Sequence, residues 1–564
     1  MSRSLYISIF LFFGNNLFAQ PIIDKIEKIN TYPQDQIVIS GSGFSATLAN
    51  NLVWFENIRG NVVQATATNL LVQVPPSAKA GNVEVFNTQT RLSGKSKLKF
   101  IPSYSGSAFD PNKLSAPLQT SSTLAVFDIC TCDFDGDNKP DLLGSKFENA
   151  ATDLILLRNL STIGNLSFST FDKTNLSALN LNAPSSHLAC GDLNADGKAD
   201  VVASRSGTIA SNIYILKNTS AGATNFDNPI QLSLDPGHFA RQVVIQDLNM
   251  DGKPDIAVAN SFNNVFYIFE NQSSGGNLQI NPTPIKISVT GFPNTLAIEA
   301  QDFDNDGKTD LVVTQNQGAN LALLRNNSSG NFSFVQQTPF AAVGSFNDLN
   351  AADFNKDGKM DLVATSIFSA EAKVFINTST VGNISFASPL TLGMGSGTSI
   401  GPFGVEVADI NGDTFVDIII QKRGVTSFNV FEHNGNITTP GFINHTIATS
   451  KNNWFAKVTD LDGDAKPEIA FTSFSGTGNT IDILRNTNCF KPQILNESPV
   501  NICPGQNITL QSIPNPAATY DWKNNASTFQ TGVSASATIS TSGNFTVVAN
   551  TEGGTCSITS NIFV

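Results

Sequence analysis

Seven short acidic segments hold the residues of this sequence that are best suited to metal chemistry. We call them loops 1 to 7, and they read DFDGDNKPD (133–141), DLNADGKAD (192–200), DLNMDGKPD (247–255), DFDNDGKTD (302–310), DFNKDGKMD (353–361), DINGDTFVD (409–417) and DLDGDAKPE (460–468). Successive loops start 59, 55, 55, 51, 56 and 51 residues apart. Oxygen-bearing side chains stand at positions one, three, five and nine, and position two is always apolar. Ca²⁺ takes about six to eight oxygen ligands, so this pattern predicts a calcium loop.

The predicted ligands are the side-chain oxygens at positions one, three, five and nine and the backbone carbonyl at position seven. These residues are Asp133, Asp135, Asp137, Lys139, Asp141, Asp192, Asn194, Asp196, Lys198, Asp200, Asp247, Asn249, Asp251, Lys253, Asp255, Asp302, Asp304, Asp306, Lys308, Asp310, Asp353, Asn355, Asp357, Lys359, Asp361, Asp409, Asn411, Asp413, Phe415, Asp417, Asp460, Asp462, Asp464, Lys466 and Glu468. We expect the lysine ammonium groups at position seven to point outward. Thr414 takes the place of the usual Gly in loop 6, and a β-branched residue suits a φ > 0 turn poorly, so we expect this site to be the weakest.

Other acidic loops differ from this pattern. An EF-hand needs a bidentate Glu at position 12 and flanking helices, whereas here the last acid stands at position nine and an apolar strand follows at once, as in 255–258. Calcium-binding β-helices repeat about every nine residues. One such loop alone could be a plain Asp/Gly turn, but seven in register favour metal binding.

Each repeat contains four predicted strands. One apolar strand precedes the loop, as in 243–246, and another follows it. The third ends at an Asn, which we interpret as a turn residue that tolerates φ > 0; these are Asn159, Asn218, Asn271, Asn326, Asn377, Asn434 and Asn486. The fourth is more polar and carries a Phe, as at Phe168 and Phe226. Four strands in each of seven repeats predict an all-β chain with a seven-bladed β-propeller.

The loops resemble the FG-GAP/VCBS-type repeats of integrin α-chain propellers and of many exported bacterial surface proteins. The resemblance covers residues 106–488. It implies a seven-bladed propeller with up to seven structural calcium ions, one in the loop between the first two strands of each blade.

The segments on either side of the repeats are predicted to be small sandwiches. Residues 21–101 resemble an IPT/TIG domain, an immunoglobulin-like fold, through the segment ISGSGF (39–44) and the strand at 81–87. Residues 490–564 resemble an immunoglobulin-like domain through the order Cys503, Trp522, Cys556. Residues 1–19 are predicted to be a signal peptide rather than a buried strand, because Arg3 precedes a short apolar run. The mature chain would then be secreted or exposed at the cell surface.

The six cysteines allow one favoured pairing, Cys503 with Cys556, which spacing alone does not prove. Cys130 and Cys132 precede loop 1 by three residues and one, whereas Cys190 precedes loop 2 by two. We therefore expect their side chains to face opposite ways and to form no disulfide. Cys489 has no assigned partner.

Composition narrows the function. The formal net charge of −13 excludes nucleic acid as the main partner, because phosphate binding needs a basic surface. The loops hold 24 of the 46 Asp and Glu residues, so seven calcium ions would nearly cancel this charge. The metal is expected to be structural, and direct bridging of a ligand by calcium is the alternative. No apolar run after the signal peptide is long enough to span a membrane.

Two functions remain open. The first is a binding or adhesion protein for an extracellular glycan or protein. The second is a polysaccharide lyase or hydrolase that uses the propeller face, for which His187, His238 and Arg241 near the channel mouth are the only candidates. No nucleophile elbow, P-loop or zinc-protease motif is present, and catalytic residues are therefore not assigned.

The seventh repeat lacks a fourth strand before the chain leaves it. Residues 107–118 have the character of the fourth strands near Phe226 and Phe386, including the Pro at 117. We therefore expect this segment to supply the outer strand of the seventh blade, where Pro is tolerated.

Overall fold

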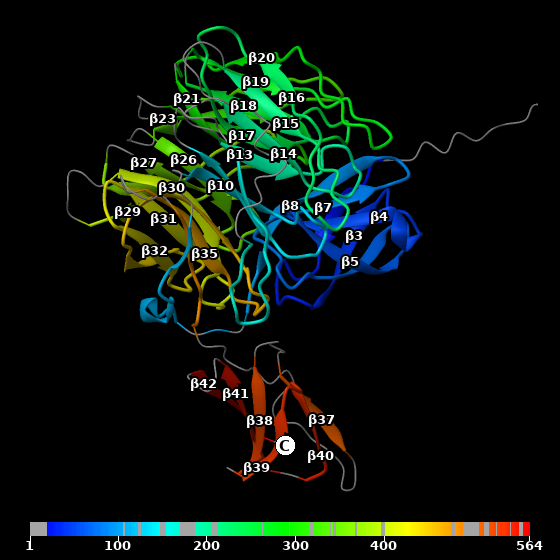
Figure 1. Cartoon of the computed structure of the whole chain (residues 1–564), viewed down its shortest axis with the longest axis vertical. Coiled ribbons are helices and arrows are strands. Elements are labelled where there is room, and N and C mark those ends of the chain that lie inside the picture. Colours follow the sequence, from blue (N-terminus) through cyan, green and yellow to red (C-terminus); the bar gives the residue numbers. More distant parts are fainter. Residues whose placement is uncertain are drawn as a thin grey trace, which may run out of the picture.

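The computed structural model of the chain consists almost entirely of β-strands (Figure 1). It describes residues 20–104, 106, 108–121, 126–146, 154–169, 187–205, 211–261, 263–292, 294–315, 320–338, 340–341, 346–366, 369–395, 401–474, 480–488, 507–512, 518–525, 527–541, 543–551 and 556–563. Within these ranges the only helical elements are two short 3₁₀ turns, η1 (Leu48–Asn50) and η2 (Pro111–Lys113), and no helix is long and apolar enough to cross a membrane. The predicted signal peptide lies outside the described residues. The all-β prediction is confirmed.

Seven small antiparallel sheets follow one another along the chain, and in each of them an acidic loop joins the first strand to the second. The sheets are, in order, β10 (Val126–Cys132), β11 (Asp141–Lys146) and β12 (Ile155–Leu157); β13 (Leu188–Gly191), β14 (Asp200–Arg205), β15 (Asn212–Leu216) and β16 (Ile230–Ser233); β17 (Ala240–Gln246), β18 (Asp255–Asn260), β19 (Val265–Phe269) and β20 (Ile285–Ser288); β21 (Thr295–Gln301), β22 (Asp310–Gln315), β23 (Asn320–Asn326), β24 (Phe334–Gln336) and β25 (Phe340–Ala341); β26 (Phe346–Ala352), β27 (Asp361–Ser366), β28 (Glu371–Phe375) and β29 (Leu390–Gly393); β30 (Gly401–Ala408), β31 (Asp417–Arg423), β32 (Ser427–His433) and β33 (Phe442–Ala448); and β34 (Asn452–Thr459), β35 (Glu468–Phe474), β36 (Thr480–Leu484) and β9 (Leu118–Ser121).

These sheets form a closed ring, the propeller predicted from the repeats. The first strand of each sheet lies beside the first strand of the next, and β34 lies beside β10. β9 comes from the segment before the first repeat and pairs with β36, with Leu118 opposite Ile483. The prediction that a segment before the first repeat completes the seventh sheet is therefore confirmed, but the strand lies at Leu118–Ser121, whereas within the predicted 107–118 Leu114 forms an isolated bridge with Asn486. Among the described residues the first sheet has three strands, and Asn159 and Phe168 form an isolated bridge where a fourth strand is expected.

The apolar cores lie between neighbouring sheets. Cys132 and Phe134 of the first sheet pack with Val201 and Leu216 of the second, so one face of a sheet meets the opposite face of the next. A side chain an odd number of residues before one loop can therefore contact a side chain an even number of residues before the next loop. The prediction of no disulfide here is wrong, because Cys132 and Cys190 are bonded with their Cα atoms 6.7 Å apart. The two cysteine side chains do face opposite ways relative to their own sheets. This orientation brings them together, because one face of each sheet packs against the opposite face of the next.

The N-terminal domain packs eight strands in the order β1-β3-β6-β5-β4-β7-β8-β2. Their bounds are β1 (Ile22–Ile26), β2 (Asn30–Thr31), β3 (Gln36–Ser42), β4 (Asn51–Phe55), β5 (Ile58–Ala65), β6 (Asn69–Gln73), β7 (Gly81–Asn87) and β8 (Leu92–Pro102). Its core is formed by alternating apolar residues such as Val53, Phe55, Val72 and Val85. In Figure 1 this domain lies against the ring.

The C-terminal domain has two sheets around the buried Trp522. One sheet pairs β37 (Ile508–Gln511) with β40 (Ser536–Ile539), and the other has the order β39 (Ser527–Gly532), β38 (Thr519–Asn524), β41 (Asn544–Thr551) and β42 (Cys556–Phe563). Cys489 and Cys503 lie outside the described residues. The Cys503–Cys556 disulfide therefore stays a prediction.

Candidate metal sites

All seven loops have the same backbone conformation. Positions four and six take φ values between 57° and 89° in every loop, including the non-glycine residues Asn138, Asn305 and Thr414. Two left-handed residues separated by one right-handed residue curl the chain tightly, which turns its N–H groups inward. Thr414 has a φ of 74°, so this β-branched residue does occupy the strained region, as the sequence predicted.

The side-chain oxygens at positions one, three and five hold this curl together. The carboxylate at position one accepts the N–H of position six at 2.8–2.9 Å in all seven loops. The oxygen at position three accepts the N–H of position five at 2.9–3.2 Å. The carboxylate at position five accepts the N–H of position seven at 2.8–3.1 Å. Each loop therefore gathers its three side-chain oxygens on one side.

Three loops bring three carboxylates within reach of one ion. One oxygen from each member lies within 4.8 Å of the others in the sets Asp133, Asp135 and Asp141; Asp302, Asp304 and Asp306; and Asp460, Asp462 and Asp464. In loops 2, 3, 5 and 6 an Asn replaces the acid at position three and makes the same backbone contact through its Oδ1. Among the described residues, the buried Oδ1 of Asp302 has no hydrogen-bond partner. A buried carboxylate oxygen without a donor fits a cation.

Without a cation these carboxylates are in an unfavourable environment. Burial raises the pKa of Asp192 to about 7 and that of Asp302 to about 6, and neighbouring loop carboxylates add to both shifts. Burial also raises the pKa of Asp310 to about 8, again with nearby carboxylates contributing. An oxygen-seeking divalent cation would supply the missing positive charge.

The acid at position nine has a different place from the other predicted ligands. It is fully buried, and one of its oxygens accepts the N–H of position two, at 2.7–3.0 Å. Its other oxygen accepts the N–H at the end of the third strand, as Asp310 Oδ1 does from Asn326 at 2.8 Å. This carboxylate therefore clamps three parts of one sheet, and only in loop 1 does it also belong to a set of three close acids.

Family models match both the ring and the N-terminal domain. An FG-GAP-like repeat matches residues 133–203, 192–258, 247–313 and 302–364, and an IPT/TIG domain matches residues 21–100. The chain carries FG-GAP-like repeats and an IPT/TIG domain. No curated protein matches the sequence.

Solved structures show distant likeness to the chain. An auxiliary nutrient binding protein from Bacteroides thetaiotaomicron is 10% identical, with a TM-score of 0.32, over 83% of this chain and 98% of that one. A similarly titled protein from Bacteroides ovatus is 11% identical, with a TM-score of 0.32, over 83% and 98%. A lectin from Agrocybe aegerita, described as recognising non-reducing terminal N-acetylglucosamine, is 18% identical, with a TM-score of 0.42, over 65% and 87%. These likenesses are too distant to carry functional information.

An arginine accompanies each of the seven loops that has Asp at position three. Arg325, on the third strand of its sheet, contacts Asp304 and Asp306 at 2.7 Å each. Arg158 and Arg485 make the corresponding ion pairs in loops 1 and 7. At the place equivalent to Arg325, loops 2, 3, 5 and 6, which have Asn at position three, are accompanied by Lys, Glu, Ile and Glu, respectively. The arginine therefore balances the fourth carboxylate, and this co-occurrence is visible in the sequence although the prediction missed it.

The Asn at the end of the third strand links neighbouring repeats, a role that the sequence interpretation missed. Six of the seven predicted Asn residues do end the third strand, and none of these six has φ > 0. The interpretation of this Asn as a left-handed turn residue is therefore wrong. Instead the side-chain Nδ2 donates to the carbonyl at position two of the preceding loop, at 2.7–3.0 Å, in Asn159, Asn218, Asn271, Asn326, Asn377 and Asn486. Asn159 donates to Leu461 of loop 7, so the series closes around the ring.

Two further side chains differ from the prediction. In the sixth repeat His433, not Asn434, donates its backbone N–H to Asp417, because the chain reaches the acid one residue earlier. Its ring stacks on Phe415 with centroids 4.8 Å apart. At position seven, Lys466 is fully buried beside Asp464, 3.2 Å away, so its ammonium does not point outward. The ammonium groups of Lys139 and Lys359 instead donate hydrogen bonds to backbone carbonyls of the turn that follows the third strand.

The candidate catalytic residues do not converge. His187 lies 3.5 Å from Asp128 in a cavity lined by the ring and the IPT/TIG domain. His238 contacts Asn260 and Tyr267 on the third sheet, and Arg241 donates to Ser261. No set of acid, base and positioning groups is formed by these three residues.

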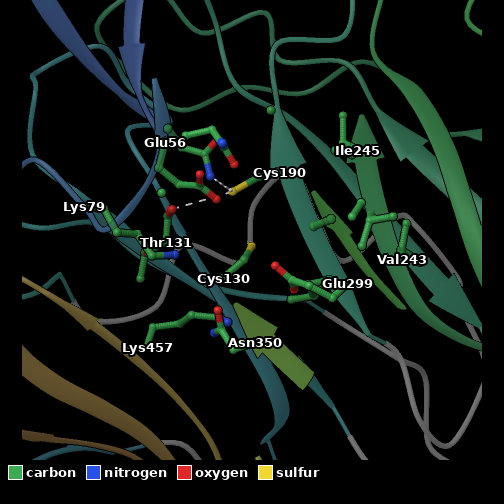
Figure 2. Close-up of a pocket in the computed structure, with 18 of the residues that line it drawn as sticks. Glu56, Lys79, Cys130, Thr131, Cys190, Val243, Ile245, Glu299, Asn350 and Lys457 are labelled. Carbon is green, nitrogen blue, oxygen red and sulfur yellow. Dashed lines mark hydrogen bonds between the residues drawn. The ribbon is translucent and has the colours of Figure 1, made fainter. Parts of the chain in front are cut away.

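Among the cavities that the described residues form between the ring and the IPT/TIG domain, two are lined by charged side chains of both. The first, of about 260 Å³, is lined by charged residues of both, including Lys79 and Glu84 from the domain and Glu299 and Lys457 from the ring, and Figure 2 shows these surroundings near Cys190. The second, of about 730 Å³, lies between loops 1 and 2 and the strands β4 and β5, and Arg59 contributes to its wall.

Proposed function

We propose that the chain is an exported, calcium-stabilised propeller that binds an extracellular glycan or protein without transforming it. The observation that carries the calcium assignment is the recurring curl of the seven loops, which gathers oxygen side chains and leaves Asp302 Oδ1 without a donor. FG-GAP-like repeats support a binding role. Calcium in every loop would also offset the formal charge of −13.

The residues at positions one, three and five would hold the ion, with the backbone carbonyl of position seven. A bound calcium ion supplies positive charge and fixed coordination and does not act as a reagent. The acid at position nine would act mainly by clamping the loop to the second and third strands, since only in loop 1 does it lie close enough to two other loop acids to share one ion with them. The ion would thereby fix the start of each sheet to its return strand.

Calcium titration of the whole chain tests this proposal. Extracellular calcium modules bind with Kd of about 10⁻⁴–10⁻³ M, and at tenfold excess each native-only site adds about 1.4 kcal/mol of stability. We expect native mass spectrometry to find several calcium ions, and chelation to lower the melting temperature by many degrees. Mg²⁺ should not substitute, because it prefers a smaller and stricter octahedral site. No bound calcium and an unchanged melting curve would reject the assignment.

The proposed ligand site is the groove of about 730 Å³ between the IPT/TIG domain and loops 1 and 2. Its volume falls within the range of about 300–1,000 Å³ that is usual for ligand sites. Arg59 is exposed on its wall and can bond hydroxyl or carboxylate oxygens. In a glycan array in calcium, Arg59→Ala should reduce binding, whereas Gln64→Ala, exposed on the same strand but outside the groove, should not. Turnover of a polysaccharide would instead favour an enzyme.

A further inference from the structure

The seven loops lie at one end of the ring, because each joins the first strand of its sheet to the second. The IPT/TIG domain contacts this end, and its last strand, β8, bonds to loops 3 and 4 through Ser93 and Lys97. This arrangement places the candidate metal sites in the interface between two domains.

Backbone and side-chain hydrogen bonds join the domain to loops 2 and 3. Arg91 Nη1 donates to the carbonyl of Ala195 at 2.6 Å. The backbone N–H of Ser93 donates to the carbonyl of Gly252 at 2.7 Å. Gln20 Nε2 donates to Asp247 Oδ2, the predicted first ligand of loop 3, at 3.1 Å.

The segment that directly follows the domain contacts loop 6. Ser103 Oγ donates to Asp409 Oδ2 at 2.6 Å, and Tyr104 Oη donates to the carbonyl of Ile410 at 2.7 Å. Both Ser103 and Tyr104 are 1% exposed. A Cβ added at Gly412 would lie 2.1 Å from the carbonyl oxygen of Tyr104. The two backbones therefore pack too closely to leave room for a side chain at Gly412.

Some of the docking contacts do not involve the predicted metal ligands of the loops. Lys99 Nζ lies 3.2 Å from Glu299 and 2.8 Å from Asn350, both on inner strands of the ring. Leu98 and Ile101 pack into apolar clusters between sheets of the ring. Loop 5, by contrast, exchanges no hydrogen bond with the domain in the part of the chain that the structure describes, although it has the same Asp-Asn-Asp pattern as loop 3.

We propose that metal occupancy of loops 3 and 6 controls how firmly the IPT/TIG domain is docked on the ring. This inference rests on the proposed calcium binding. A bound ion holds the loop backbone in the shape that the domain contacts, and loss of the ion frees that backbone and leaves repelling carboxylates in the interface. Undocking would open the charged cavity shown in Figure 2 to solvent. The coupling is reciprocal, so a docked domain raises the metal affinity of these loops.

Hydrogen–deuterium exchange of the whole chain in millimolar calcium tests the coupling, read at peptides covering residues 92–104. Asp247→Asn in loop 3 weakens its metal site while leaving an oxygen for Gln20, and Asp353→Asn is the matched change in loop 5. We expect Asp247→Asn to raise exchange in 92–104 by about fivefold or more, and Asp353→Asn to leave it unchanged. Native mass spectrometry should show that each variant has lost one calcium ion.

The possible results separate the two proposals. Equal exchange in both variants, with one ion lost from each, would overturn the coupling and leave calcium binding intact. No calcium on the wild-type chain would overturn both. A second variant acts from the other side of the interface: Tyr104→Phe removes the bond to the carbonyl of Ile410, which is not a predicted ligand of the ion. It should weaken calcium binding at one site by about fivefold, and an unchanged titration would contradict the reciprocity.

Discussion

The amide of Asn326 offers a sharp test of how neighbouring repeats are held together. Its side chain is fully buried, and Nδ2 donates to Leu248 of loop 3 at 3.0 Å and to Thr309 of loop 4 at 2.8 Å. Its Oδ1 accepts the N–H of Ser328 at 2.8 Å. Asn326→Ala leaves these three backbone groups without a partner, at about 1 kcal/mol or more each, so unfolding should become easier by about 3 kcal/mol. For a cooperative unit of about 380 residues the unfolding entropy is about 0.8 kcal/mol/K, so the melting temperature should fall by about 4 °C.

The neighbouring Asn327 provides the control. It is exposed, and within the described residues its side chain makes no hydrogen bond, so Asn327→Ala should change stability by less than about 0.5 kcal/mol. Asn326→Asp keeps the volume and an acceptor but loses both donors and adds a charge beside Asp310, so it should be at least as harmful as Asn326→Ala. Thermal and urea unfolding in millimolar calcium measure all three. Equal midpoints for Asn326→Ala and Asn327→Ala would refute the idea that this amide links the repeats.

Three further perturbations address the loops and the ring. Thr414→Asn should stabilise the chain by about 1 kcal/mol, because Asn tolerates the φ of 74°; a lower urea midpoint would show that Thr414 is not strained. Cys190→Ser removes a cross-link between residues 58 positions apart and should lower the free energy of unfolding by about 4 kcal/mol, whereas Cys130→Ala should lower it by about 1 kcal/mol. Equal losses of stability would show that the disulfide does not stabilise the ring. The calcium-free chain should lose stability as pH rises from about 4 to 8. The native pKa of Asp310 is about 8 against about 3.9 when unfolded, so the native state binds more protons over this range; a urea midpoint that rises with pH would contradict this.

Repetition made the ring predictable from the sequence. One acidic loop is ambiguous, but seven loops at a spacing of 51–59 residues, each followed by an apolar strand, leave few architectures. The same comparison between repeats showed that the seventh lacked an outer strand and where the chain held a spare one, which is the segment that pairs with β36. Internal comparison also located the left-handed position in loop 6 occupied by Thr414.

Two of the errors share one physical origin, since they concern contact between sheets rather than within one sheet. The strand-end Asn was interpreted from local turn preferences, whereas its amide reaches the backbone of the preceding loop. Cys132 and Cys190 were compared as if they belonged to one pleated surface, whereas they project from facing surfaces of two sheets. The contact between the segment after β8 and loop 6 joins residues such as Ser103 and Asp409, which are far apart in sequence and follow no repeating pattern.

The arginine partners change how the loops should be ranked. By carboxylate count, loops 1, 4 and 7 would attract calcium more strongly than the other four. Each of these three loops also has an arginine on its position-three and position-five carboxylates, as Arg325 has on Asp304 and Asp306. Four acids and one guanidinium leave the same excess negative charge as three acids, and in loop 7 the buried ammonium of Lys466 lowers that excess further. The loops with four acids are therefore electrostatically no more negative than the others. Differences in affinity should then follow backbone strain, as at Thr414, and contacts with the IPT/TIG domain, as at Asp409, more than the number of carboxylates.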